Sequence, residues 1–366
     1  MRRKRSARPR KRHINWRWPA AALALAAVLA GCSALPKLGL PSAVISFSGR
    51  ADAQVQPAAP APTAAVPDVQ PAPPAVATPG VPKPAVPTPA APDLRTLQQE
   101  ISDYVGRQDG TYGVYVIDIA SGKGTGVNAD MKFPTASTFK LPMAMYILNQ
   151  VELGKAVLDQ SLSYSAEDYE EGTGTLQDSV SEGDSFTVKE LIDLAITQSD
   201  NIATNMLLRR FGRENVYAYM KKLGGKVTIY SDPENGSTTG TTPKEMANYM
   251  RLAYGKTAIG DAKLRQFLLD LLTHTAFDDR AAAGVPRGVK VAHKIGTLPN
   301  VVNDVALVYA PRRTFVVAVY SVGVEEETAA AVIAEVTRRV YDFERDLSTS
   351  AAQQNPETSV NGALPK

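Results

Sequence analysis

A serine and a lysine three residues apart, Ser137 and Lys140, stand at the start of an apolar stretch that predicts a helix. Residues with this spacing share one face of a helix, and a serine in the first turn lies near the positive end of the helix dipole, which favours a developing anion. A lysine that is desolvated in an apolar pocket can lose its proton and act as a base. The pair is suited to be a nucleophile and its base, although an N-cap serine beside a lysine with an extended stem gives the same pattern.

Two further segments carry polar groups at predicted junctions of the fold. Ser199 and Asn201 lie between two predicted helices, where a hydroxyl and an amide could pass a proton and hold a substrate carbonyl, or simply cap a helix. Lys294 lies on a predicted strand and is followed by Gly296 and Thr297. A glycine in a strand allows a ligand to approach the backbone closely, and a sheet edge can bind a substrate as an added strand. A strand end followed by a turn is the simpler alternative.

The elements that must position these residues lie between Asp93 and Asp346, a stretch long enough for one substantial core. A helix-rich middle runs from Ser137 to about Leu272, with helix-start signals near Thr187, Asp200 and Thr242. Periodicity predicts helices over 94–107 and 326–345, and strands over 112–120, 289–295, 301–309 and 314–322. Strands at both ends of a helical middle predict an α+β fold. Its antiparallel sheet is built from both domain termini and flanked by helices, with a helical subdomain.

The N-terminal segment differs from the rest in charge. All nine basic residues of the first 31 positions lie between Arg2 and Arg17, and without them the remaining 31 Lys and Arg against 37 Asp and Glu give a net charge of −6 in place of +3. No basic face for nucleic acid is predicted in the remainder. An apolar run over 20–30 follows, too short to span a bilayer. A basic segment, a short apolar run and small residues before a cleavage site are typical of an export signal.

The run ends in Leu29-Ala30-Gly31-Cys32, which resembles the lipobox of bacterial lipoproteins. The resemblance implies a signal peptide over 1–31, a lipidated Cys32, anchoring to a bacterial membrane, and an extracytoplasmic location in the periplasm or at the cell surface. An uncleaved N-terminal anchor and an ordinary signal peptide are the alternatives. Cys32 is the single cysteine of the chain, which excludes an internal disulfide and a cysteine-based zinc cluster.

Two further segments lack the composition of a folded domain. Between Pro57 and Pro92 lie thirteen of the 26 prolines, mixed almost entirely with Ala and Val. Such a stretch cannot bury enough surface to offset the entropy of ordering. Residues 32–92 are therefore predicted to be a disordered linker, extended by about 3.1 Å per residue where it is rich in proline. The polar composition of 347–366 predicts a disordered tail.

Taken together, the three motifs resemble one family. S-x-x-K, S-D-N and K-T-G in this order is the signature of class A β-lactamases and penicillin-binding proteins. This chain has the first two unaltered and the third as Lys294-Ile295-Gly296. The contexts PTASTFKLP, QSDNIATNMLL, TTPKEM and PRGVKVAHKIGTL are also similar to that family. The chain is identified as a member of the serine β-lactamase superfamily, and it resembles the class A branch over nearly its whole globular part.

The resemblance implies a β-lactamase/transpeptidase-like fold with a cleft between a sheet domain and a helical domain. Ser137 would be the nucleophile that forms an acyl-enzyme, and Lys140 its base or part of the proton relay. Ser199 would pass a proton to the leaving nitrogen. Asn201 would bind the amide side chain of the substrate.

The strand motif would bind the rest of the substrate. The resemblance implies that Lys294 holds the substrate carboxylate and that Gly296 lets the ligand approach. It also implies an oxyanion hole formed by the backbone N–H groups of Ser137 and Thr297, commonly worth about 3–4 kcal/mol per donor. No metal and no organic cofactor is implied. The globular part holds only two histidines, His274 and His293, so a Ser-His-Asp triad is a less favoured interpretation than the serine–lysine pair.

The chain departs from the family pattern at two places. Ile295 stands where the family usually carries a hydroxyl, so Thr297 would have to supply that contact. The E-x-x-L-N pattern of the class A deacylation loop is missing before the T-T-P helix, where Glu234 is the nearest candidate. Glu170 and Glu171 could also line the cleft, although exposed loop acids are the simpler interpretation.

These residues are compatible with three functions. The leading one is an exported serine hydrolase, predicted to be a monomer, that opens β-lactam rings through an acyl-enzyme on Ser137. The second is a cell-wall enzyme of the D-alanyl-D-alanine peptidase kind, whose substrate would be a peptidoglycan peptide. The third is a sensor that binds β-lactams or peptidoglycan without turnover. The presence or absence of a deacylation group separates the first from the others.

Overall fold

The computed structural model describes residues 93–226, 239–311 and 313–354. Cys32 with the predicted signal peptide and linker, and the loop that contains Glu234, lie outside these residues. Their features remain predictions from the sequence.

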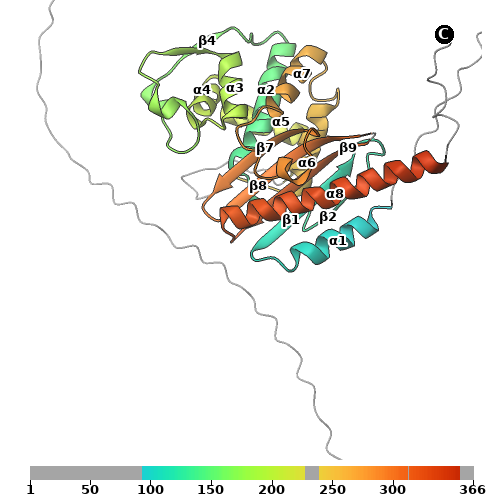
Figure 1. The fold of residues 1–366 in the computed structure, drawn as a ribbon. Coiled ribbons are helices and arrows are strands. Elements are labelled where there is room, and N and C mark those ends of the chain that lie inside the picture. The colour runs from blue at the N-terminus through green and yellow to red at the C-terminus, as the bar shows by residue number, and fades with distance from the viewer. Residues whose placement is uncertain (1–92, 227–238, 312, 355–366) are drawn as a thin grey trace, which may run out of the picture. The chain divides into compact units, whose positions relative to one another are not determined.

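The sheet expected from both ends of the domain is present (Figure 1). It has five antiparallel strands in the order β2-β1-β9-β8-β7. β1, near the start of the domain, pairs with β9, near its end, from Thr111 opposite Val322 to Asp118 opposite Phe315. The α+β class, with one antiparallel sheet built from both domain termini, is confirmed. The strands are β1 Thr111–Asp118, β2 Gly124–Val127, β7 Lys290–Leu298, β8 Val301–Ala310 and β9 Arg313–Val322.

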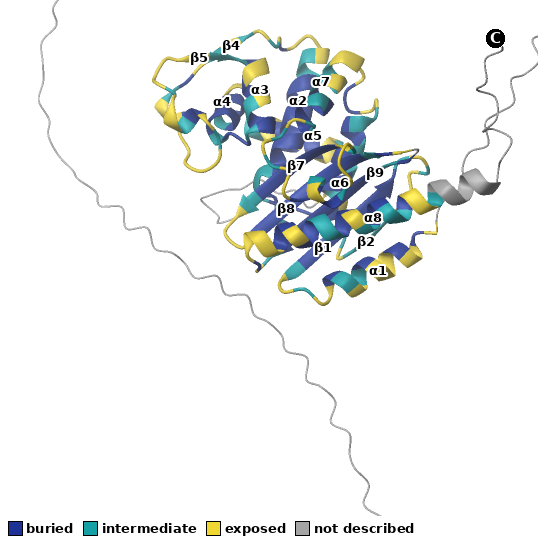
Figure 2. Ribbon diagram, viewed as in Figure 1, coloured by how far each residue is buried: buried dark blue, intermediate teal, exposed yellow. Residues whose placement is uncertain are grey.

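Helices α1 (Arg95–Val105) and α8 (Glu326–Gln354) pack on one face of the sheet (Figures 1 and 2). The predicted apolar stripe of α1 is buried in a cluster with residues of the sheet and α8, and Leu97 and Ile101 have no exposed surface. α8 continues to Gln354 instead of ending near Arg345, because a formed helix propagates at little cost through residues such as Ala and Gln. The first residues of the predicted disordered tail are therefore helical.

A helical part packs on the opposite face of the sheet and extends away from it (Figure 1). Helix α2 (Lys140–Glu152) lies in its core, and Leu141, Met143, Met145 and Ile147 have no exposed surface. A helix that is apolar on all sides belongs in the interior. The other helices are α3 Val188–Thr197, α4 Asn201–Phe211, α5 Arg213–Lys222, α6 Pro243–Tyr254 and α7 Ala262–Leu272. The short elements are β3 Phe133–Pro134, β4 Ser161–Ser163, β5 Ser185–Thr187, β6 Gly240–Thr241, and the 3₁₀ turns η1 Ala136–Phe139, η2 Ala166–Asp168, η3 Leu176–Asp178 and η4 Ala282–Gly284.

The three helix-start signals are confirmed as N-caps. The side chains of Thr187, Asp200 and Thr242 each accept a hydrogen bond from the backbone N–H three residues later, at the starts of α3, α4 and α6. Such a bond satisfies one of the unpaired donors at a helix start. The cap at Asp200 fixes the point where α4 begins, and with it the positions of Ser199 and Asn201.

A buried ionic group ties the sheet to α8. Arg313 of β9 donates hydrogen bonds to Asp118 of β1 at 2.7 Å and to Glu344 of α8 at 2.8 Å. Both carboxylates are fully buried. Burial and the nearby Asp118 charge raise the pKa of Glu344 to about 7, although Arg313 opposes this.

None of the helices within the described ranges has the length and apolar character of a membrane span.

Candidate active site

The predicted site residues meet at one cavity of about 650 Å³ between the sheet and the helical part. Ser137, Lys140, Asn201 and Thr297 line it. Ser199 and Lys294 are buried and hydrogen-bonded to each other, and Oγ of Ser199 lies 3.4 Å from Nζ of the cavity-lining Lys140. The structure thus brings together side chains from three motifs that are far apart in the sequence.

Ser137 lies in a 3₁₀ turn and not in the first turn of an α-helix. The turn η1 begins at Ala136, and α2 starts only at Lys140. Ala136 has a φ of 47°, in the left-handed region that side chains other than glycine rarely adopt. Backbone outliers of this kind cost about 1–3 kcal/mol and gather at functional sites. The strained residue directly precedes the candidate nucleophile and determines where Ser137 enters the cavity.

Lys140 is almost completely buried beside this turn. Its Nζ donates hydrogen bonds to the backbone oxygen of Ser199 at 2.5 Å and to Oδ1 of Asn201 at 2.7 Å. Burial lowers the pKa of Lys140 to about 7, although the charges of Asp200 and Glu170 act in the opposite direction. A neutral amine has two N–H groups and one lone pair. The two short bonds use both donors, which leaves the lone pair free to take a proton.

Ser199 lies between two lysine amines. Its Oγ accepts a hydrogen bond from Lys294 at 2.9 Å and lies 3.4 Å from Nζ of Lys140. Ser199 also has a positive φ of 54°, a strained conformation that directs the hydroxyl between the two amines. Burial and the neighbouring Lys140 charge hold the pKa of Lys294 well below its usual value. The arrangement provides a short path for protons from one lysine to the other through the serine hydroxyl.

Gly296 allows the strand to approach the nucleophile. A Cβ at this position would lie 3.0 Å from the backbone nitrogen of Ser137 and 3.1 Å from that of Thr138. β7 extends past its predicted end at Ile295 to Leu298, so Gly296 and Thr297 are strand residues. β7 is also an edge strand of the described sheet, and its residues Thr297 and Leu298 line the cavity.

Arg280 is a site residue that sequence reasoning missed. It is 1% exposed, and its guanidinium donates to Oγ1 of Thr297 at 2.9 Å and to Glu326 at 2.6 Å. It therefore brings a positive charge behind the hydroxyl that lines the cavity. The local sequence gave no signal, because Arg280 follows Asp278 and Asp279 and reads as part of an exposed charged turn.

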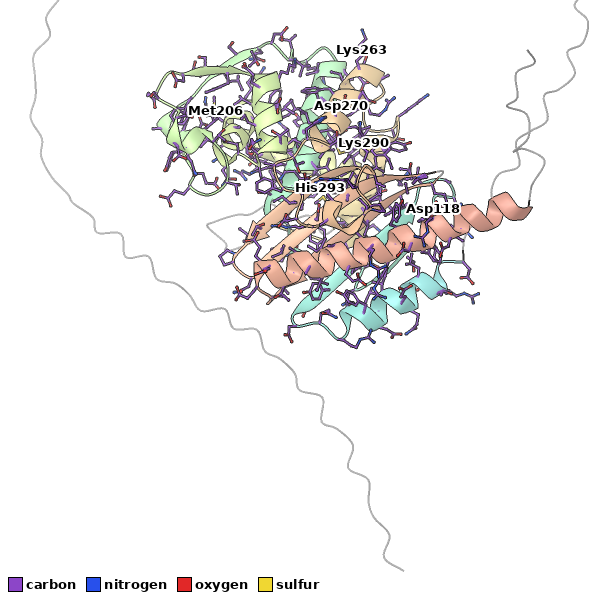
Figure 3. The ribbon with its side chains drawn as sticks, viewed as in Figure 1. Asp118, Met206, Lys263, Asp270, Lys290 and His293 are labelled. Carbon is purple, nitrogen blue, oxygen red and sulfur yellow. The ribbon has the colours of Figure 1, made fainter. Side chains whose placement is uncertain are left out.

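His293, labelled in Figure 3, has partners at both of its ring nitrogens. Its Nδ1 lies 3.0 Å from the buried carboxylate of Asp304, and its Nε2 lies 3.1 Å from Oγ1 of Thr275. Burial alone would lower the pKa of His293, but the charge of Asp304 raises it. Both ring nitrogens have partners other than Ser137, so the structure does not form a Ser-His-Asp triad with this histidine.

The loop that carries Glu170 and Glu171 lines the cavity and is firmly held. The second carboxylate oxygen of Asp200 accepts hydrogen bonds from the backbone nitrogens of Thr175 and Leu176 at 2.8 and 2.9 Å. A Cβ on Gly174 would lie 2.2 Å from this oxygen. Asp200 therefore caps α4 with one oxygen and binds the loop with the other, a second role that the capping signal did not reveal.

Comparison with known sequences gives a consistent result. A family model described as the beta-lactamase enzyme family matches residues 96–343. Beta-lactamase AST-1 of Nocardia asteroides is 33% identical over 244 residues, which are 63% of this chain and 78% of that protein. Beta-lactamase SME-1 of Serratia marcescens is 28% identical over 247 residues, 63% of this chain and 83% of that protein.

Solved structures agree with the sequences. PBP-A superposes with a TM-score of 0.65 at 28% identity, covering 69% of this chain and 97% of that one. Its L158E mutant, an acyl-enzyme complex with penicillin G, gives 0.64 at 29% identity with the same coverage. An ancestral class A β-lactamase gives 0.61 at 34% identity, covering 68% of this chain and 99% of that one. The described domain therefore corresponds to nearly the whole of each of these structures.

Proposed function

Because this chain belongs to the class A β-lactamase family, we propose that it opens β-lactam rings through an acyl-enzyme on Ser137. Membership of the family implies a serine hydrolase. The observation that carries the specific proposal is the hydroxyl of Ser199 between two buried lysines, beside the cavity that Ser137 lines. Nucleophile, base and proton relay are thus assembled in one place.

In the proposed acylation step, Oγ of Ser137 attacks the lactam carbonyl and its proton passes to the neutral amine of Lys140. The backbone N–H groups of Ser137 and Thr297 stabilise the oxyanion. The C–N bond then breaks, and Ser199 donates a proton to the departing nitrogen. Ser199 recovers a proton from Lys140, whose Nζ lies 3.4 Å from its Oγ, so the proton taken from Ser137 ends on the nitrogen and Lys140 is neutral again.

Substrate recognition rests on the two walls of the cavity. Asn201 donates one amide hydrogen to the backbone oxygen of Glu171 at 3.1 Å, which leaves the other for the carbonyl of the substrate's amide side chain. On the sheet side, Lys294, Thr297 and Arg280 concentrate positive charge and hydroxyl donors where a substrate carboxylate would bind. The proposed ligand therefore carries an amide and a carboxylate on either side of the reactive carbonyl.

Intact-protein mass spectrometry after brief exposure to penicillin G tests the proposal. We expect a single adduct on the full chain, and none on Ser137→Ala. Ser137 is only partly buried, so the alanine variant is expected to fold. An adduct of unchanged yield in the alanine variant would disprove the assignment of the nucleophile.

A long-lived acyl-enzyme is the second candidate function. It is supported by the absence of the E-x-x-L-N pattern from the sequence and by the likeness to PBP-A, whose L158E mutant is seen as an acyl-enzyme with penicillin G. A protein of this kind would be acylated without rapid release. A burst followed by a slow steady rate with a chromogenic β-lactam is expected if deacylation limits turnover.

A further inference from the structure

Hydrolysis of an acyl-enzyme requires a base that takes a proton from water close to the ester. Among the residues that the structure describes, which exclude Glu234, four glutamates line the cavity: Glu170 and Glu171 on the helical side, and Glu325 and Glu326 on the sheet side. Glu326 is bound to Arg280 at 2.6 Å. A base that works with Lys140 is therefore best sought on the helical side.

One face of α4 holds the loop that carries the two helical-side glutamates. Asn201, Asn205 and Arg209 follow one another at intervals of four residues, which places them on the same side of the helix. Asn201 binds the backbone oxygen of Glu171 at 3.1 Å. Arg209 forms a 2.8 Å ion pair with Asp168, which is 1% exposed. The loop is therefore fixed along two turns of α4.

The middle residue of this face binds a carboxylate. Nδ2 of Asn205 donates a 2.8 Å hydrogen bond to Oε2 of Glu170. One turn earlier, Oδ1 of Asn201 accepts from Nζ of Lys140 at 2.7 Å. Side chains four residues apart on a helix have Cβ atoms about 5–6 Å apart. Glu170 and Lys140 are thus bound by neighbouring side chains of one helix face, and both line the cavity that Ser137 lines.

Glu170 and Glu171 differ in how they are bound. Glu171 is held through its backbone oxygen, whereas Glu170 is held through its carboxylate. The field of Glu170 also reaches Lys140, whose pKa it raises in opposition to burial. A carboxylate with one oxygen fixed by Asn205 keeps its other oxygen for a water molecule.

We propose that Glu170 is the general base that activates water for hydrolysis of the acyl-enzyme on Ser137. The inference rests on the proposed function. A water oxygen bonds to the ester carbon while one water proton passes to the carboxylate of Glu170. The bond from the carbon to Oγ of Ser137 then breaks, and Oγ takes that proton. The products are a free carboxylic acid and the regenerated serine.

The test compares charge-removing variants of the full chain with penicillin G as the probe. In Glu170→Gln, we expect the adduct on Ser137 to form at the wild-type rate and to persist at least about 100-fold longer, the lower end of the usual effect of a general base. kcat and KM are expected to fall together, because acylation is unchanged and the acyl-enzyme accumulates. Glu170 is exposed, so this variant is expected to fold.

Three further variants make the test specific. Glu167→Gln removes a charge from the same loop outside the cavity, and its adduct lifetime is expected to match the wild type. Glu171→Gln removes a charge inside the cavity and is expected to have a much smaller effect than Glu170→Gln. Asn205→Ala, which frees the carboxylate, is expected to lengthen the lifetime by an intermediate amount. Glu170 is a general base and Asn205 a positioning residue in this scheme.

The outcomes separate this inference from the proposed function. A normal adduct lifetime in Glu170→Gln overturns the role of Glu170 and leaves acylation of Ser137 intact. Equal effects of Glu170→Gln and Glu171→Gln overturn it too, since the effect would be one of net charge. A wild-type adduct that is never released also overturns the role of Glu170, because no hydrolysis of the acyl-enzyme would then occur. Failure of the wild type to form any adduct overturns both proposals.

Discussion

Two lysine amines share one serine hydroxyl at the centre of the site. Oγ of Ser199 lies 2.9 Å from Nζ of Lys294 and 3.4 Å from Nζ of Lys140, and all three side chains are buried. Two ammonium groups at this separation, removed from water, repel each other. The substrate carboxylate that we propose binds here would favour the charged form of a nearby amine and would thereby couple substrate binding to proton uptake.

The acylation rate is expected to rise with pH through about pH 7, because burial lowers the pKa of Lys140 to about 7 and only the neutral amine accepts the proton of Ser137. Lys140→Ala should slow acylation by about 10²–10⁴-fold and remove this inflection. Quenched-flow mass spectrometry of the adduct on both sides of neutral pH measures the effect. Lys155→Ala, which changes an exposed lysine just beyond the C-terminal end of α2, is the control. A flat profile in the wild type would contradict the role of Lys140 as base.

Residues of the site that belong to short motifs could be found from the sequence. The spacing of Ser137 and Lys140 at the start of an apolar stretch identifies them as candidate site residues. Arg280 and Asn205 could not be found in this way, because their roles depend on partners far along the chain, Thr297 and Glu170. No local pattern records such a contact.

At the scale of elements, α4 determines the geometry of one wall of the site. Its cap, Asp200, uses one oxygen for the helix and the other for the backbone of the neighbouring loop. The cap was predictable because it depends on residues three positions apart. The docking of the loop was not, because Thr175 lies 25 residues before Asp200. The two acids of this loop are exposed, as the simpler interpretation expected, and they also line the cavity.

The ionic group beneath α8 makes stability depend on pH. The pKa of Glu344 is raised to about 7 in the folded chain from a usual value of 4.5, by burial and by Asp118. The folded state therefore holds a proton that the unfolded state releases, and this stability is lost as pH rises from about 4.5 through 7. The loss can reach about 3 kcal/mol by linkage. Urea unfolding at a series of pH values should show this decline in the wild type.

The variant Glu344→Gln isolates the source of that decline. Glutamine keeps the size of the side chain and a carbonyl oxygen that accepts from Arg313, but it does not titrate. We expect its free energy of unfolding to be less dependent on pH across this window. Glu335→Gln, on the same helix with a partly exposed side chain, is the control. An equally steep decline in Glu344→Gln would show that other groups cause it.

At the scale of the whole domain, the sheet joins the N-terminal and C-terminal parts of the domain. β1 and β9 come from opposite ends of the domain and pair over eight residues of β1, while the described residues that line the cavity lie between α1 and Glu326, the first residue of α8. The order of strands and helices along the sequence was enough to predict the α+β class. The strand order β2-β1-β9-β8-β7 was not predictable, because it depends on which long-range pairings bury the most apolar surface.

Outside the described residues, Leu29-Ala30-Gly31-Cys32 at the end of a short apolar run predicts that Cys32 carries lipid. Buried acyl chains contribute about 0.8 kcal/mol per CH₂, and two chains hold a protein stably on a membrane. The wild-type chain should therefore partition with bacterial membranes, whereas Cys32→Ser should be released or remain an unprocessed precursor. Acylation of Ser137 should be unchanged, because the reacting groups lie far along the chain. Ser42→Ala, which removes a nearby hydroxyl outside the motif, is expected to fractionate as the wild type does. A wild-type protein that is soluble, with an N-terminus well downstream of Cys32, would show that the segment is an ordinary signal peptide.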